Sequence, residues 1–269
     1  MLTFLFWNVN GKPLSDAIAA IAHDEAIDVL ILAECGLEPA ALLRALNREE
    51  RAFHFAPGQS RRINIFSRFP GRYLRPAYES DRISIRRLAL PVSEEVLLVA
   101  VHFPSKLHWS NESQTMECAV LSRTIADEER RAGHSRTVLV GDLNMNPFES
   151  GVVGASGLHA VMARKVAERV ERTVQGVAYP FFSNPMWGHL GDWADRPPGS
   201  YYYERAEHVN YFWNTFDQVL VRPQLMERFR SDQVRLLSRA GATSLRTEDG
   251  RPNTVDGSDH FPLLFKLDL

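Results

Sequence analysis

The chain has 269 residues, of which 45% are hydrophobic and 24% charged, and this length and composition are those of a globular protein with one large core. Its 31 basic and 33 acidic residues give a formal net charge of −2. This balance excludes an overall field that would attract nucleic acid or an anionic membrane. A phosphate ligand is still compatible with it, because a bound metal ion supplies positive charge locally.

Cysteine usage and the amino-terminal segment bear on the compartment. Cys35 and Cys118 are too few for a disulfide framework and fall in segments expected to be core or helix. "MLTFLFWNVNG" has no basic lead and no small-residue cleavage site, so we interpret it as a first strand. No stretch approaches the length of a membrane span. We therefore expect a cytoplasmic protein with reduced thiols and no obligate protein partner.

Strand-like and helix-like segments are interleaved without strict alternation. "LTFLFWNV" predicts a strand, and apolar residues at helical spacing predict a helix over 13–27. "DVLILAE" is typical of a buried strand that ends at Glu34, and a second helix is expected over 39–50. Shorter strands are predicted from "INIFSRF", "YLRPAY", "RISIRRLAL" and "EVLLVAVHF".

The second half of the chain opens with the longest predicted helix, over 113–132. Its apolar face is expected to carry Met116, Val120, Leu121 and Ile125. The segments "RTVLVGDL", "FDQVLVRP" and "HFPLLFKL" predict three more strands.

No repeat, low-complexity tract or long linker divides the chain, so one domain is expected over 1–269. An aromatic-rich insertion at about 175–214 holds Trp187, Trp193 and Trp213 beside Tyr201–Tyr203. Between core strands, such an insertion is expected to be an ordered loop. Strands mixed with helices in one body indicate an α/β (α+β) layered sandwich with helices outside.

Polar residues repeatedly stand where a predicted strand begins or ends. They are Asn8 and Asn10 after "FLFW", Glu34 after "VLILA", His102 after "LLVAV", Asp142 and Asn144 after "VLVG", Asp217 before "QVLV", and Asp259 and His260 before "FPLLF". A single one is weak evidence, because turns use the same residue types. Six such sites, drawn only from carboxylate, amide and imidazole, indicate a catalytic site.

The chemistry that uses this set is metal-assisted phosphoester hydrolysis. The hard oxygen ligands Glu34, Asp259, Asn8 and Asn10 suit Mg²⁺ or Mn²⁺, and no Cys/His cluster suits zinc. Such an ion would neutralise the charge that develops on a phosphate and stabilise the leaving oxygen.

In-line attack also needs a water molecule that is held and partly deprotonated on the opposite face of the phosphate. A carboxylate, or an imidazole oriented by a second acid, provides that base. His102 and His260 meet this requirement, with Asp217 to orient one of them. The sequence does not say which.

The segments "FWNVNG", "ILAE", "VAVHFPS", "GDLNMNP", "FDQVLV" and "GSDHFPL" resemble, in order and rough spacing, those of the endonuclease/exonuclease/phosphatase superfamily. The resemblance spans nearly the whole chain, from Trp7 to Leu264. The group includes deoxyribonuclease I, the exonuclease III and apurinic/apyrimidinic endonucleases, inositol polyphosphate 5-phosphatases and neutral sphingomyelinases. The resemblance implies a four-layer α/β/β/α sandwich, with two sheets face to face and the site at one end.

Residue roles also follow from the resemblance, by matched position. Asn8 and Glu34 resemble the metal and phosphate pair, with Asn10 a weaker addition. Asp142 and Asn144 resemble the pair that positions or activates the attacking water.

Two further positions match on the carboxy-terminal side. His260 resembles the histidine that contacts the scissile phosphate, and Asp259 resembles a metal-side carboxylate. His102 falls where the deoxyribonuclease-I-like and phosphatase branches carry a second histidine, whereas the abasic-site branch looks different there.

Three flanking features allow two interpretations each. Arg61 and Arg62 would form a phosphate clamp through charge-assisted bonds, or a solvated strand start. Lys106 and His108 would line the cleft as substrate-binding groups, or face water. The aromatic insertion would stack bases as single-strand binders do, or form the loop's own small core, which is the favoured interpretation.

The sequence as a whole predicts a phosphoester hydrolase that depends on a divalent metal. A nuclease acting on DNA or RNA is the leading hypothesis. A phosphatase or phosphodiesterase for a phosphoinositide or another small phosphorylated metabolite is the alternative, because the charge is near neutral and the insertion would narrow the cleft. A non-catalytic binding module ranks last, because none of the principal positions is lost.

Overall fold

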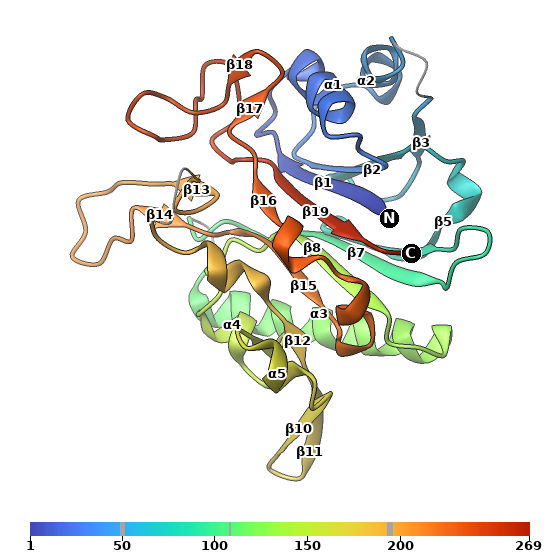
Figure 1. The fold of residues 1–269 in the computed structure, drawn as a ribbon. Coiled ribbons are helices and arrows are strands. Elements are labelled where there is room, and N and C mark those ends of the chain that lie inside the picture. Colours follow the sequence, from blue (N-terminus) through green and yellow to red (C-terminus); the bar gives the residue numbers. More distant parts are fainter. Residues whose placement is uncertain (49–51, 108, 193–195) are drawn as a thin grey trace.

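A computed structural model describes residues 1–48, 52–107, 109–192 and 196–269. His108 and Trp193, which the sequence singled out, lie outside the described residues, as does the end of the second predicted helix at 49–50. Two large sheets, one of six strands and one of seven, organise the chain (Figure 1).

The first sheet contains both ends of the chain. Its strands, in spatial order, are β16 (Arg235–Leu236), β19 (Leu263–Leu267), β1 (Leu2–Asn8), β2 (Val29–Ala33), β4 (Ile63–Ser67) and β3 (His54–Ala56). β1 pairs in parallel with β2 and antiparallel with β19. Every residue of β2 is buried, as its unbroken apolar run predicts for a strand covered on both faces.

The second sheet holds the middle of the chain. Its strands, in spatial order, are β5 (Leu74–Glu79), β6 (Ile83–Leu88), β7 (Val96–His102), β8 (Thr137–Asp142), β15 (Asp217–Val221), β12 (Phe182–Ser183) and β9 (Ala160–Val161). Alternate residues of β7 face two different cores: Leu98 and Ala100 lie in one cluster, and Leu97 and Val99 in the other. The first core lies between the two sheets and the second lies under a helix.

Helices form the two outer layers. They are α1 (Ser15–Asp24), α2 (Pro39–Leu46), α3 (Asn111–Ala132), α4 (Ser150–Val153) and α5 (Arg164–Ala167), with 3₁₀ turns η1 (Gly71–Tyr73), η2 (Pro185–His189), η3 (Pro223–Arg228) and η4 (Ser231–Gln233). Figure 1 shows α1 and α2 beyond the first sheet, and α3, α4 and α5 beyond the second. The predicted four-layer α/β/β/α sandwich is confirmed.

The long helix α3 has well-defined ends. The Ser110 hydroxyl accepts a hydrogen bond from the backbone N–H of Ser113, and Gly133 ends the helix with φ of +76°. The prediction for its buried face was partly wrong. Met116 and Val120 are 70% and 42% exposed.

The buried stripe of α3 runs instead through Gln114, Cys118, Leu121 and Ile125. This i, i+4, i+7, i+11 spacing follows the helical period more closely than the stripe that the sequence suggested. This stripe includes a buried polar residue, Gln114.

Replacing Met116 with glutamine should leave the free energy of unfolding within about 0.5 kcal/mol of the wild-type value, because the side chain is largely in water. Urea denaturation followed by circular dichroism measures this. A destabilisation above about 2 kcal/mol, the range of a core truncation, would mean that Met116 belongs to the buried face after all.

The described parts of the aromatic-rich insertion, 175–192 and 196–214, hold regular structure and contribute strands to two hairpins and to the second sheet. β10 (Glu171–Val174) and β11 (Val177–Pro180) form one hairpin, and β13 (Tyr201–Tyr202) and β14 (Trp213–Asn214) form another. β12 joins the second sheet between β9 and β15. Trp213 stacks on Phe261, with ring centroids 6.3 Å apart. The partly buried Trp213 ring therefore packs against the main core, whereas the small-core interpretation expected a core within the loop itself.

Neither the thiols nor the described helices have the properties of a reactive cysteine or a membrane span. Burial raises the pKa of both Cys118 and Cys35, which disfavours a reactive thiolate at either position. Among the described residues, none of the helices has the length and apolar character needed to cross a membrane. A short two-stranded unit, β17 (Arg239–Ala240) with β18 (Thr243–Ser244), completes the regular structure.

Candidate active site

Three polar side chains lie in one row at the end of the second sheet. His102 closes β7, Asp142 closes β8 and Asp217 opens β15, and Asp142 is the register partner of both others. All three are buried. Because in-register residues of neighbouring strands present their side chains to the same face, the sequence places these three groups together as soon as the strand order is known.

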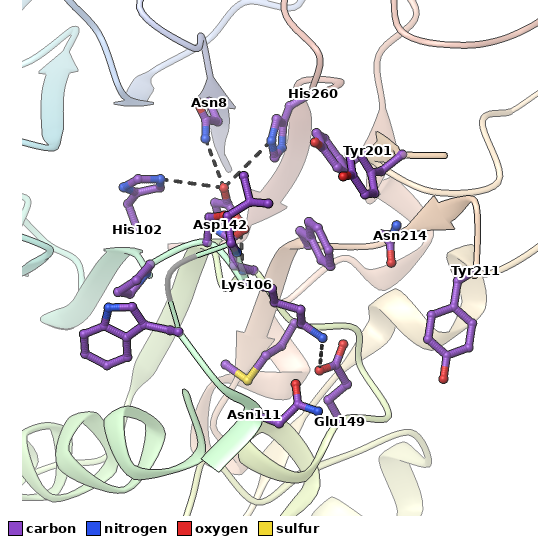
Figure 2. Close-up of a pocket in the computed structure, with 18 of the residues that line it drawn as sticks. Asn8, His102, Lys106, Asn111, Asp142, Glu149, Tyr201, Tyr211, Asn214 and His260 are labelled. Atoms are coloured by element: carbon purple, nitrogen blue, oxygen red, sulfur yellow. Dashed lines mark hydrogen bonds and ion pairs between the residues drawn. The ribbon is translucent and has the colours of Figure 1, made fainter. Parts of the chain in front are cut away.

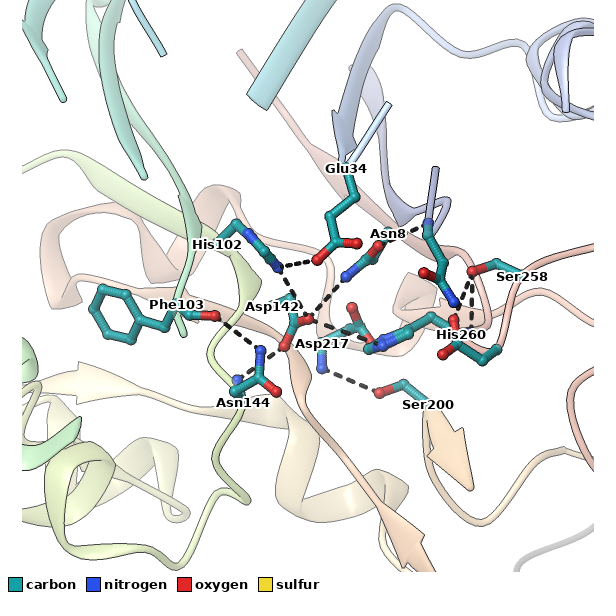
Figure 3. A network of polar contacts seen from close by, with 12 residues as sticks. Asn8, Glu34, His102, Phe103, Asp142, Asn144, Ser200, Asp217, Ser258 and His260 are labelled. Atoms are coloured by element: carbon teal, nitrogen blue, oxygen red, sulfur yellow. Dashed lines mark hydrogen bonds and ion pairs between the residues drawn. The ribbon is translucent and has the colours of Figure 1, made fainter. Parts of the chain in front are cut away.

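The first sheet contributes Asn8, Glu34 and His260 to the opposite side. The Asn8 side-chain N–H donates to Asp142 Oδ2 at 3.0 Å, and Glu34 Oε1 lies 3.0 Å from His102 Nε2. His260 Nδ1 lies 2.7 Å from Asp217 Oδ2. Each of these contacts crosses from one sheet to the other (Figure 3). The site is therefore the seam between the sheets.

Asp217 orients His260 and not His102. The imidazole is held further by its own backbone, because Trp7 Nε1 donates to the His260 carbonyl at 2.8 Å. Its Nε2 lies 3.9 Å from Asp142 Oδ2. The ring therefore presents Nε2 to the centre of the site while Nδ1 is engaged behind it.

The protonation of this pair follows from its surroundings. Burial by itself would lower the pKa of His260, but the charges of Asp217 and Asp142 outweigh it and raise the pKa to about 10. Burial also raises the pKa of Asp217, against the opposing effect of His260. The pair therefore retains a proton at neutral pH, and His260 Nε2 is a hydrogen-bond donor.

Glu34 differs from these buried groups because its side chain is 31% exposed. The hydrogen bond from His102 lowers the pKa of Glu34, although partial burial opposes the shift. The carboxylate is therefore ionised at neutral pH and accessible from the cavity.

Three site residues have left-handed backbone conformations: Asn10 (φ 47°), Glu34 (φ 50°) and Asn144 (φ 49°). Asparagine tolerates this region, whereas glutamate rarely adopts it. The Glu34 backbone is held on both sides, because its N–H donates to the Arg62 carbonyl at 3.1 Å and its carbonyl accepts from Gly11 N–H at 2.8 Å. The turn directs the carboxylate into the site.

Asn144 is fixed beside Asp142 by two hydrogen bonds. Its backbone N–H donates to Asp142 Oδ1 at 2.8 Å, and its side-chain amide donates to the Phe103 carbonyl at 2.9 Å. Asn8 is held similarly, since its Oδ1 accepts from the Asn10 N–H at 3.0 Å. The carboxamides therefore position both the chain and the Asp142 carboxylate.

A cavity of about 940 Å³ opens onto this seam (Figure 2). Of the residues predicted for the site, those that line it are Asn8, Asn10, Glu34, Arg62, His102, Lys106, Asp142, Asn144, Asp259 and His260. Asp217 does not line the cavity, because it is fully buried behind His260. Lys106 forms an ion pair with Glu149, and the Ser258 hydroxyl donates to Asp259 at 3.1 Å.

Two groups of side chains have the chemistry to hold a metal. Glu34 and Asn8 offer oxygen atoms at the cavity surface, with Asn10 and Asp259 nearby on the lining, and oxygen donors suit Mg²⁺ or Mn²⁺. A second, buried group consists of Asp142, Asp217 and His260, whose ligand atoms lie within 4.8 Å of one another. In this group the Asp217–His260 hydrogen bond already engages one imidazole nitrogen.

Two residues that support the site were not predicted from the sequence. Gln114 donates from its side-chain amide to the Pro104 and Asn144 carbonyls, both at 3.1 Å, and so joins two loops of the candidate site. Ser200 accepts from the Asp217 N–H at 3.1 Å. Gln114 lies within a helix, and Ser200 precedes the two-residue strand β13 and not a long apolar run, so no local signal marked them. A glutamine on the inner face of α3 was the only available hint.

A four-layer sandwich with carboxylate, amide and imidazole groups at its seam defines a metal-dependent phosphoester hydrolase of the deoxyribonuclease-I-like class. The model of the Endonuclease/Exonuclease/phosphatase family matches residues 5–260, and the chain belongs to that family. No curated protein sequence matches the chain.

Several solved structures share the fold at low sequence identity. The chain is similar to the 3′ phosphatase NExo from Neisseria bound to a product DNA hairpin (17% identity, 100% of both chains covered, TM-score 0.59). It is also similar to an AP endonuclease from Archaeoglobus fulgidus (15% identity, 100% of both chains, TM-score 0.56). A third is TDP2 from D. rerio complexed with a single strand DNA product (17% identity, 100% of this chain and 99% of that chain, TM-score 0.57).

Proposed function

We propose that this protein is a Mg²⁺- or Mn²⁺-dependent nuclease that cleaves phosphodiester bonds of DNA or RNA by in-line attack of water. The observation that carries the proposal is the convergence of Asn8–Asp142, Glu34–His102 and His260–Asp217 at the seam beneath one cavity. Proteins of similar fold have been captured with a product DNA hairpin and with a single strand DNA product.

Glu34 and Asn8 would hold the metal, with Asp259 and Asn10 on the same lining. Glu34 is suited to this, because its carboxylate is ionised and partly exposed. When bound, the ion supplies charge neutralisation at the phosphate and at the leaving oxygen. Arg62 and Lys106 line the same cavity and would contact the substrate.

Asp142 and Asn144 would hold the attacking water. Asp142 is buried, and it accepts hydrogen bonds from the Asn8 side chain and the Asn144 backbone. These bonds fix the carboxylate in one orientation, and a carboxylate so fixed serves as the proton acceptor for the water.

His260 would donate its Nε2–H to the scissile phosphate. Asp217 fixes the ring through Nδ1, and the same carboxylate favours the protonated imidazole. His102 Nε2 lies 3.0 Å from Glu34 and 3.8 Å from Asp142, so it links the proposed metal side to the proposed water side.

A second candidate is the hydrolysis of a small phosphoester. The cavity volume of about 940 Å³ favours it, because it falls within the range of small-molecule sites. Lys106 and Arg205 on the cavity lining are paired with Glu149 and Glu207, which leaves less positive charge for additional phosphates.

Chelation should abolish cleavage of single- and double-stranded DNA and RNA by the purified protein, and added Mg²⁺ or Mn²⁺ should restore it. The measurement is the product yield on labelled oligonucleotides, with a panel of phosphomonoesters and phosphoinositides run in parallel. Metal-dependent turnover of the small substrates alone would select the second candidate. The absence of metal-dependent cleavage of any nucleic acid would refute the nuclease assignment.

We further propose that residues 1–269 act as one domain in the cytoplasm. One core cluster includes Phe4 of the first sheet and Val140 of the second, which supports a single cooperative unit. Both cysteines are free thiols, which suits a reducing compartment.

A further inference from the structure

Exposed aromatic rings line one side of the catalytic cavity. Phe148, Tyr203 and Tyr211 are 38%, 39% and 58% exposed, and all three lie on its lining. Figure 2 shows Tyr211 on the opposite side of the cavity from His102, with Asp142 and Asn214 between them. A group of exposed rings at a cavity wall marks a candidate ligand contact.

These rings form an organised surface. The Phe148 ring meets the Tyr211 ring edge to face, with centroids 5.4 Å apart, and is supported by Trp187 at 6.3 Å. Tyr203 N–H donates to the Phe212 carbonyl at 2.8 Å, which holds the strands of the β13–β14 hairpin together beyond their paired residues. Tyr203 also stacks on Tyr201, with ring centroids 6.4 Å apart. The three rings are therefore supported by neighbouring rings or backbone, and each keeps an exposed part toward the cavity.

The hairpin is tied to the loop that carries Asp142 and Asn144. Asn146 donates from its side-chain amide to Asn214 Oδ1 at 2.9 Å, and its own Oδ1 accepts from the Thr215 N–H at 2.9 Å. Both asparagines are buried. The aromatic surface therefore keeps a fixed position relative to the residues proposed to hold the attacking water.

Two arginines stand on the cavity lining next to Glu34 and His102. Arg62 and Arg82 line the cavity, and their carbonyls accept from the Glu34 and His102 N–H groups at 3.1 and 3.0 Å. Within the described residues, neither guanidinium forms a salt bridge, whereas Lys106 is neutralised by Glu149. Two free cations suit a short stretch of phosphates and not the backbone of a long duplex.

We propose that Phe148, Tyr203 and Tyr211 form a stacking subsite for an unpaired base next to the scissile phosphate, so that the substrate is single-stranded nucleic acid. The inference rests on the proposed nuclease function and specifies its substrate class. A base within a duplex is already stacked on its neighbours and presents only its edge, whereas an unpaired base can lay its face on a ring.

The test uses the full-length protein and Tyr211→Ala, with Tyr211→Phe as the variant that keeps the ring. Phe212→Ala is the matched control, because Phe212 is an exposed ring of the same hairpin but lies outside the cavity lining. We expect Tyr211→Ala to raise KM for a single-stranded oligonucleotide about tenfold with kcat little changed. Tyr211→Phe and Phe212→Ala should keep the wild-type KM.

A binding measurement separates failure of the subsite from failure of the nuclease assignment. An oligonucleotide containing 2-aminopurine, titrated in the presence of chelator, should lose fluorescence on stacking with wild type and Tyr211→Phe but not with Tyr211→Ala. Cleavage without quenching, with KM unchanged in Tyr211→Ala, would overturn the subsite alone. Preference for duplex over single strand would do the same. Quenching without cleavage would overturn the nuclease assignment but keep the subsite. The absence of both quenching and cleavage would overturn both proposals.

Discussion

Replacing Asp142 with asparagine should lower kcat about 10³-fold while leaving the protein folded. The carboxylate stands at the centre of the seam, where it accepts from the Asn8 side chain at 3.0 Å and from the Asn144 backbone at 2.8 Å. An asparagine could still accept from Asn144, but its amide N–H₂ would then face the Asn8 N–H₂. The variant would lose both the proton acceptor and the bond between the sheets.

The measurement is steady-state cleavage at saturating metal, with the melting temperature recorded alongside. Asp232→Asn is the matched control, because its carboxylate is exposed on η4 and does not line the cavity. We expect Tm of Asp142→Asn to stay within about 5 °C of wild type, because loss of one hydrogen bond is offset by removal of a buried charge. An active Asp142→Asn enzyme would remove Asp142 from the mechanism.

Replacing Gly141 with alanine should destabilise the fold by about 3 kcal/mol or more, a large share of the stability of a typical domain. A Cβ atom at this position would lie 2.0 Å from the Val101 carbonyl oxygen and 2.8 Å from its carbon. Those atoms belong to the backbone of β7, the register partner of β8 at this point. They cannot move aside without separating two central strands.

Gly71→Ala provides the control, because a Cβ there meets no atom within 4 Å. It should change the free energy of unfolding by less than about 1 kcal/mol. Urea denaturation curves for both variants give the comparison. Equal midpoints for Gly141→Ala and wild type would show that the central strands tolerate a side chain at their closest approach.

Most of the site could be predicted from the sequence, and the reason is geometrical. Apolar runs in the sequence predict buried strands, and His102, Asp142 and Asp217 each stand at one end of such a run. Strand ends gather at the edges of sheets, so polar residues at several ends were expected to meet. The fold followed from the same runs together with their resemblance to a known family.

The other features of the site depend on tertiary packing, which the sequence alone does not reveal. Whether Asp217 orients His102 or His260 is decided by the packing of one sheet on the other. Gln114 could not be distinguished from a solvated helix residue, because its partners are backbone carbonyls of loops far along the chain. The exposed Tyr211 and the partly buried Trp213, which packs against the core, are two residues apart, and only the hairpin geometry separates their environments.

The pairs Asn8–Asp142, Glu34–His102 and His260–Asp217 each join a residue of one half of the molecule to a residue of the other. The rate of turnover should therefore depend on the relative position of the two halves. A displacement too small to expose the core would already separate these donors from their acceptors. As denaturant is added, we expect enzymatic activity to be lost before the circular dichroism signal decreases. Substitutions in the core between the sheets, far from the site, should reduce activity although every residue of the site is unchanged.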